Sequence, residues 1–209
     1  LGLPEIFRDA FLEESILETA SGINTVPCML RTAVVPEGLF ITAYPQSGKG
    51  ARLHGRLCKI RRKLPAAKSL LDISLHEEMQ TVNRNREELL LVSPNGHVLE
   101  GATTNLLFVR GKNILAPEKD TLTGITRQVL EERIPKPWQW EVTDVHLDDL
   151  PEMDEILVCG SGKEVAQIIN IADSEWKPRS NQAFMALSRI YGAAKLLYLR
   201  ENSSKNPRP

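Results

Sequence analysis

The sequence predicts a mixed α/β fold, of the α+β kind, in which hairpin strands outnumber helices. Two apolar runs, Glu88 to Val92 and His97 to Leu99, flank Asn95-Gly96, and Asn-Gly is the strongest short hairpin signal. Few helical periodicities interrupt the strands, and the sequence contains no glycine-rich nucleotide fingerprint. These observations exclude a helical bundle and disfavour a regular βαβ repeat.

The first fifty residues carry one helix and two strands. Apolar side chains near helical spacing predict a helix from about Glu5 to Ala20. Strand-forming residues fill Val26–Val35 and Leu39–Ala43, with a Pro-Glu-Gly turn between them. Residues 46–50 are small and polar, so we place a domain boundary between this loop and about Arg62.

The rest of the chain alternates short strands with two helices. We expect a short helix from Gly124 to about Ile134 and a C-terminal helix from about Asn181 to Arg200. Residues 201–209 are polar and are expected to fray. The remaining strands are predicted at Leu106–Arg110, Asn113–Ala116, Glu155–Cys159 and Val165–Ile171.

The composition of the chain argues against several classes of partner and site. The net charge of −1 gives no sign of a nucleic-acid partner, and no apolar run approaches the length that spans a bilayer. Three cysteines without a CxxC pair and four scattered histidines suggest neither a disulfide framework nor a metal site. The acidic stretch from Asp144 to Glu155 is most simply a solvated surface.

Four short segments carry residue types suited to chemistry, and they follow one another along the chain. The first places Lys68 and Ser69 shortly after a proline, and the second places Glu100 after the Asn-Gly hairpin, thirty-two residues further on. The third is a Gly-Ile-Thr-Arg helix start, and the fourth a Gly-Ser-Gly turn after a strand. The four segments are Arg62–Ser69, Leu99–Phe108, Leu122–Arg127 and Cys159–Val165.

Taken in this order, the four segments resemble the class IV (fold type IV) pyridoxal-phosphate enzymes. That family includes branched-chain aminotransferases, D-amino-acid aminotransferases and 4-amino-4-deoxychorismate lyases. The resemblance implies that residues 1–55 are the remainder of a small α/β domain and 62–200 a large cofactor-binding domain, with a tail at 201–209. The large domain is expected to hold a strongly curved, barrel-like mixed sheet.

The resemblance also assigns roles at the reactive end of the cofactor. Lys68 would hold pyridoxal phosphate as a Schiff base and would move the proton between the substrate Cα and the cofactor. Its amine must be neutral for part of the cycle, which burial favours. Glu100 would keep the pyridine nitrogen protonated, and Thr103 and Asn105 would support the same site. The equal alternative for Asn105 is a buried side chain that satisfies the backbone of a loop.

The phosphate end needs hydroxyls and backbone N–H groups. By resemblance, Thr126 and Ser161 supply the hydroxyls. The resemblance also implies that the backbone N–H groups of Ile125, Thr126 and Ser161 complete the phosphate cradle. Gly124 and Gly160 belong to the same set of expected cofactor-binding residues.

The sequence departs from the family in three places. It begins at Leu1 without the family's N-terminal strands and phosphate arginine, and Arg61 and Arg62 lie too close to Lys68 to be that arginine. An unpaired Asp72 near the lysine would be unusual, so we expect it to face elsewhere. At the substrate side, Lys163 and Gln167 replace residues that are commonly small or a Thr-Pro pair.

Three functions remain open at this level. The first is transfer of an amino group between an amino acid and a 2-oxo acid, and the second is a lyase of the aminodeoxychorismate type. The third is a truncated, non-catalytic relative that binds a partner chain. The resemblance implies a homodimer without a nucleic-acid or membrane partner, in the cytoplasm or in an organelle such as a plastid or mitochondrion.

Overall fold

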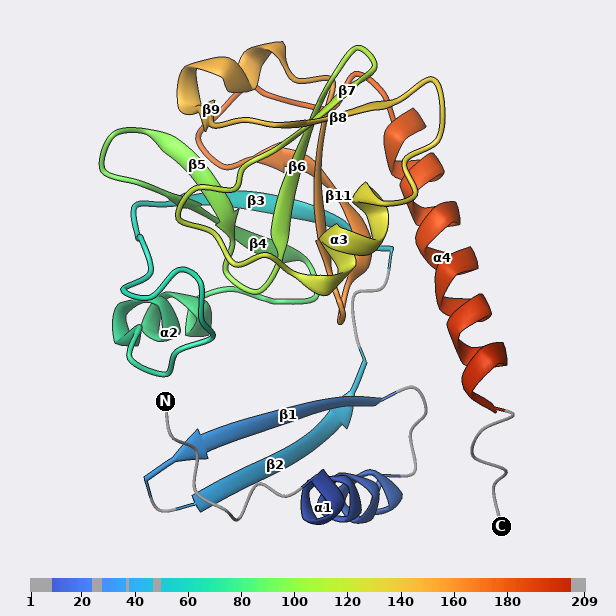
Figure 1. Cartoon of the computed structure of the whole chain (residues 1–209). Coiled ribbons are helices and arrows are strands. Elements are labelled where there is room, and N and C mark those ends of the chain that lie inside the picture. The colour runs from blue at the N-terminus through green and yellow to red at the C-terminus, as the bar shows by residue number, and fades with distance from the viewer. Residues whose placement is uncertain (1–8, 24–27, 37, 47–49, 204–209) are drawn as a thin grey trace. The chain divides into compact units, whose positions relative to one another are not determined.

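A computed structural model describes residues 9–23, 28–36, 38–46 and 50–203 (Figure 1). The chain divides into two compact units, Leu1–Ser47 and Gly48–Pro209. The expected tail beyond residue 203 and the ends of the first predicted helix and strand lie outside the described residues.

The first unit holds helix α1 (Asp9–Ser21) and an antiparallel hairpin. Strands β1 (Cys28–Val35) and β2 (Gly38–Pro45) pair from Cys28 opposite Pro45 to Val35 opposite Gly38. Gly38 has a φ of 147°, a backbone angle that favours glycine and lets the chain reverse within two residues.

The second unit is built on one nine-stranded mixed sheet in the order β8-β7-β6-β10-β11-β3-β4-β5-β9. Pairs β11–β3, β3–β4 and β7–β8 are parallel, and the others are antiparallel. The strands are β3 (Arg52–Cys58), β4 (Glu87–Val92), β5 (His97–Gly101), β6 (Asn105–Arg110), β7 (Asn113–Ala116), β8 (Gln139–Val142), β9 (Val145–His146), β10 (Glu155–Gly160) and β11 (Glu164–Ile171).

The connection from β5 to β6 forces this sheet to curl. The two strands stand five places apart in the sheet, which would separate them by roughly 24 Å if the sheet were flat. Only residues 102–104 join them, a span of at most about 15 Å. The sheet therefore bends until β5 contacts β6 although they share no hydrogen-bond ladder (Figure 1). Glu100 lies beside this closing turn.

Both faces of the curved sheet are buried along β4, β6 and β10, and alternation along these strands divides the core. Leu106 and Phe108 face one cluster, whereas Leu107 and Val109 face another. Helices α3 (Ile125–Glu131) and α4 (Gln182–Ser203) cover the second cluster and pack on β10, and α4 also packs on β11 (Figure 1). Because both faces are covered, these strands are nearly continuous apolar runs.

The predicted hairpins and helices of this unit are present, but several elements escaped prediction. Strand β3 carries Arg52, His54, Gly55 and Arg56, so its strand character is hidden in composition, although alternate residues are buried. Helix α2 (Ile73–Gln80) buries only Leu75 and therefore has a weak apolar face. The 3₁₀ helix η2 (Leu147–Glu152) and strands β8 and β9 were likewise missed.

The acidic stretch is not wholly a solvated surface, and the expectation is wrong at its last residue. Glu155 lies on β10 and is fully buried, and its carboxylate is located at the start of α4. Its two carboxylate oxygens accept hydrogen bonds from the backbone N–H groups of Ala183 (2.8 Å) and Phe184 (2.9 Å). These first-turn donors have no partner within the helix, so a carboxylate from another element caps it.

No helix of the described residues is long and apolar enough to cross a membrane.

The cap gives a first prediction. Glu155→Ala should lower the free energy of unfolding by about 2–3 kcal/mol, because two buried N–H groups lose a charged acceptor. Urea unfolding followed by circular dichroism measures the change. Glu152→Ala, whose side chain is 65% exposed, is the control and should change stability by less than about 0.5 kcal/mol. Equal effects of the two substitutions would contradict the capping role.

Candidate active site

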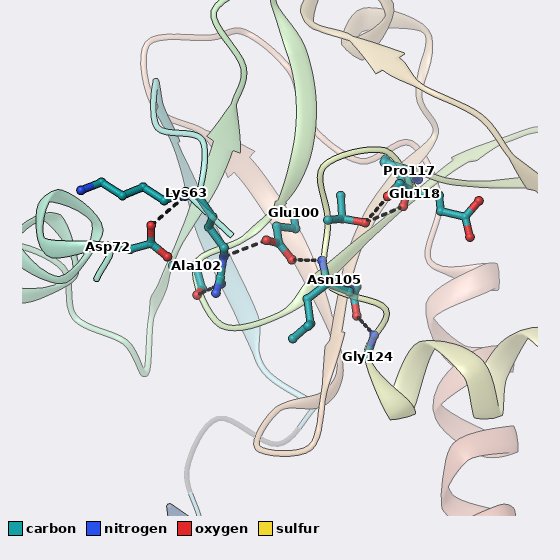
Figure 2. A network of polar contacts seen from close by, with 11 residues as sticks. Lys63, Asp72, Glu100, Ala102, Asn105, Pro117, Glu118 and Gly124 are labelled. Atoms are coloured by element: carbon teal, nitrogen blue, oxygen red, sulfur yellow. Dashed lines mark hydrogen bonds and ion pairs between the residues drawn. The ribbon is translucent and has the colours of Figure 1, made fainter. Parts of the chain in front are cut away.

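A buried carboxylate lies at the end of β5. Glu100 is 2% exposed, and Arg62 Nε lies 2.8 Å from its Oε1. The backbone N–H of Leu122 donates to Oε2 at 3.1 Å. Figure 2 shows Glu100 between the loop that carries Lys63 and Asp72 and the segment that joins Asn105 to Gly124. The carboxylate thus holds together three parts of the chain that are distant in sequence.

The environment of Glu100 favours its protonated form. The pKa of Glu100 is raised from 4.5 to about 7, and burial is the largest cause. The neighbouring guanidinium of Arg62 and the hydrogen bond from Leu122 oppose the shift, while the charge of Asp72 adds to it. Glu100 therefore changes charge near neutral pH, where a bound cation can decide its state.

The ion pair leaves one oxygen of Glu100 able to accept a hydrogen bond. Oε1 and Arg62 Nε are close, yet neither makes a well-aligned hydrogen bond. A terminal nitrogen of Arg62 donates instead to the carbonyl of Ala102 at 2.7 Å. A carboxylate oxygen has two lone pairs, so Oε1 can accept one further N–H donor while it faces Arg62.

Asn105 fixes the segment that leads into α3. Its Nδ2 donates to the carbonyl of Leu122 at 2.5 Å, and its Oδ1 accepts from the N–H of Gly124 at 3.1 Å. A Cβ at Gly124 would lie 2.3 Å from that Oδ1, so this approach requires glycine. Arg127, 1% exposed, donates to the carbonyl of Pro117 at 2.7 Å and holds the preceding loop.

The first turn of α3 presents one buried hydroxyl and several N–H groups without helical partners. Thr126 is 2% exposed, and its hydroxyl lies 3.5 Å from that of Tyr191 on α4. Ile125 is 74% exposed, which places its side chain outside the core.

The Gly-Ser-Gly turn lies close to the turn that follows Glu100. A Cβ at Gly160 would lie 3.4 Å from the carbonyl of Thr103, and Cys159 pairs directly with Asn105 in the sheet. Thr103 lies in the turn between β5 and β6, Ser161 lies in the turn between β10 and β11, and both are exposed. The pairing of β10 with β6 therefore brings the second and fourth sequence motifs together.

Lys68 lies in the loop between β3 and α2, and its side chain is exposed. The burial expected for this side chain is not present within this unit. In the described part of the chain, no hydrogen bond or ion pair links Lys68 to Glu100. The loop is closed at its base, where Asp72 Oδ1 accepts from the N–H of Lys63 at 2.9 Å.

The structure brings the second, third and fourth sequence motifs together and adds three residues that sequence reasoning missed. Arg62, Asp72 and Leu122 contact or influence the carboxylate, although none was assigned a role. Asp72 does not face away from the site as expected; it is 6% exposed and lies near Glu100. Arg62 belongs to the lysine motif, which indicates that it lies near the site. The sequence does not show in which direction its long side chain points. Among the described residues, no group of three or more potential ligands is placed to hold a metal ion.

The chain belongs to the class IV amino-transferase family, whose model matches residues 39–171, more than half of its length. This confirms the resemblance drawn from the four motifs.

The similar curated proteins come from bacteria and are longer than this chain. A probable branched-chain-amino-acid aminotransferase of Rickettsia conorii is 27% identical over 175 residues, which cover 78% of this chain and 59% of that protein. An aminodeoxychorismate lyase of Bacillus subtilis is 23% identical over 184 residues, covering 84% and 63%. The chain thus spans about three fifths of the length of these relatives.

Solved structures share the fold. The T.th. branched-chain amino acid aminotransferase in complex with 4-methylvaleric acid has a TM-score of 0.70 at 25% identity, covering 92% of this chain and 71% of its own. A putative branched-chain amino acid aminotransferase from Thermotoga maritima has a TM-score of 0.74 at 18% identity, covering 92% and 74%. The expected curved mixed sheet of fold type IV is confirmed.

The raised pKa of Glu100 predicts a pH-dependent stability. The folded protein binds this proton more tightly than the unfolded chain, so its stabilisation is complete below pH 4.5 and is lost as the pH rises through 7. The free energy of unfolding of the wild type, measured relative to Glu100→Gln without ligand, should fall by roughly 3 kcal/mol across this window. Denaturant titrations at a series of pH values provide the measurement, and parallel curves for the two proteins would show that Glu100 is not the titrating group.

Proposed function

We propose that this protein is a pyridoxal-phosphate-dependent aminotransferase that transfers an amino group between an amino acid and a 2-oxo acid. The observation that carries the proposal is the buried Glu100 carboxylate, with one oxygen still able to accept a hydrogen bond. Membership of the class IV family and the names of the relatives support it.

The chemistry of Glu100 fits the nitrogen end of this cofactor. A pyridine nitrogen that carries a proton is a cationic N–H donor, which matches a carboxylate oxygen that can accept one more hydrogen bond. Such a cation stabilises the charged form of Glu100 and opposes the burial that raises its pKa. The ion pair of Arg62 Nε with Oε1 and the N–H of Leu122 on Oε2 hold the carboxylate in place.

The opposite end of the site suits a phosphate. The first-turn N–H groups of α3, the Thr126 hydroxyl and the turn at Ser161 are hydrogen-bonding groups of the kind that bind phosphate oxygens. Asn105 contacts Gly124 at the start of α3 and pairs with Cys159 before the turn, so one residue links both groups.

Lys68 is the proposed attachment and proton-transfer residue. It lies four residues from Asp72, which acts electrostatically on Glu100, so its Cα is within about 14 Å of Asp72. The hydrogen bond from the N–H of Lys63 to Asp72 Oδ1 closes the base of the loop that carries Lys68. When bound, pyridoxal phosphate supplies the electron sink for the bond that breaks at the substrate Cα. Lys68 Nζ carries the proton that leaves and returns there, and Glu100 holds the proton at the ring nitrogen.

Amino acids and 2-oxo acids are the proposed substrates, and a homodimer in the cytoplasm or an organelle stays a prediction from the sequence. The T.th. aminotransferase structure contains 4-methylvaleric acid. A structure of a hypothetical aminotransferase from Mycobacterium tuberculosis contains alpha-ketoglutarate. Both ligands are small carboxylic acids. The Bacillus subtilis relative favours a lyase as the second candidate. Release of pyruvate from aminodeoxychorismate, without 2-oxo acid formation from any amino acid, would select the lyase.

Cofactor attachment tests the proposal. The protein is incubated with pyridoxal phosphate, reduced with borohydride and digested, and mass spectrometry then locates the added group. We expect it on Lys68, together with a visible absorbance band before reduction. Lys68→Ala should lose the band and at least about a thousandfold of transamination rate, because the group that attaches the cofactor and moves the proton is gone.

Lys63→Ala is the matched control, since Lys63 is an exposed lysine of the same loop. It should retain both the band and the label on Lys68. A wild-type protein that takes up no pyridoxal phosphate would contradict the proposal and favour a non-catalytic relative.

A further inference from the structure

A second buried ion pair lies beside the candidate phosphate turn and has no part in the function proposed above. Lys163 follows Gly160-Ser161-Gly162 directly and is 9% exposed, and its Nζ lies 2.7 Å from Oε2 of Glu88 on β4. Glu88 is 3% exposed. A buried lysine and carboxylate that pair in this way are costly to separate, because either one left alone is an uncompensated charge.

Glu88 also contacts the turn that follows Glu100. Its Oε2 accepts a hydrogen bond from the hydroxyl of Thr104 at 3.2 Å, so a single oxygen joins two turns. The nearby Gly101 is packed so closely that a Cβ would lie 2.1 Å from Thr104 Oγ1. The turn after Glu100 is therefore rigidly packed against Glu88.

The turn that carries Ser161 ends at a residue with an uncommon backbone conformation. Its next residue after Lys163, Glu164, has a φ of 55°, a left-handed conformation that is uncommon for a residue other than glycine. Lys195 of α4 holds Glu164 at 2.8 Å, while Lys163 holds the same turn to β4. Two consecutive side chains thus fasten the turn to two different elements.

We propose that Lys163 is a positioning residue whose buried ion pair with Glu88 fixes the turn of Ser161 relative to the turn of Glu100. The pair sets the separation between the phosphate end and the ring-nitrogen end of the site, an inference that rests on the proposed function. It also accounts for a lysine at a position where the family commonly has a small residue: the side chain is directed at Glu88 and held there.

Paired variants separate positioning from simple stability. Lys163→Met leaves Glu88 buried without its cation and is expected to be unstable, so the informative protein is the double variant Lys163→Met/Glu88→Gln. It removes both charges, conserves side-chain volume, and leaves an amide oxygen at position 88 that can accept from Thr104; replacement of a whole buried pair is often tolerated. Lys112→Met is the control, because Lys112 is exposed and contacts Trp138 and Gln182 instead.

The readout is the affinity for pyridoxal phosphate relative to that for pyridoxal, which lacks the phosphate. In the double variant this ratio should fall about tenfold, while pyridoxal affinity changes by less than about twofold. The control should keep the wild-type ratio. A double variant that is stable and keeps the wild-type ratio would overturn the proposal and assign the pair to stability alone.

Hydrogen exchange of the backbone amides of residues 161–164 tests the tie without any cofactor. Their exchange should be faster in the double variant than in the wild type and unchanged in Lys112→Met. Unchanged exchange in the double variant would also overturn the proposal. A wild-type protein that bound no pyridoxal phosphate would refute the proposed function alone, because the exchange comparison still shows whether the pair fixes the turn.

Discussion

The rest of the site depends on the burial of the Glu100 carboxylate inside the curved sheet. A three-residue connection between β5 and β6 bends nine strands until the end of β5 meets the start of β6. Burial at that junction makes the charged form of Glu100 costly, so the fold must provide partners for it. Arg62 and the N–H of Leu122 are those partners, and each brings its own loop to the site.

The same junction organises the opposite end of the site. Asn105 is the first residue of β6, and it contacts Gly124 before α3 while it pairs with Cys159 before the Gly-Ser-Gly turn. A single strand start therefore aligns two turns that come from separate parts of the sequence. Glu88 on β4 pairs with Lys163, which follows the Gly-Ser-Gly turn, and accepts a hydrogen bond from Thr104 in the turn after Glu100. Buried polar side chains thus link the loops of the site to one another.

Sequence patterns predicted the elements whose side chains follow a clear period or turn signal. The Asn95-Gly96 hairpin and the helix at Ile125 are examples, and the four motifs identified the family correctly. Strand β3 was missed because arginine, histidine and glycine conceal a strand that lies between two others. The roles of Arg62 and Asp72 were missed because long or isolated charged side chains carry no directional signal; only the fold shows that both lie near Glu100.

The most direct test of the account is a crystal structure of the wild-type protein soaked with pyridoxal phosphate. The account predicts that the ring nitrogen lies within hydrogen-bond distance of Glu100, that the phosphate lies between Thr126 and Ser161, and that continuous density joins the cofactor to Lys68. A cofactor bound elsewhere, or a Glu100 carboxylate that contacts only Arg62 and Leu122 while the ring lies against other residues, would contradict it.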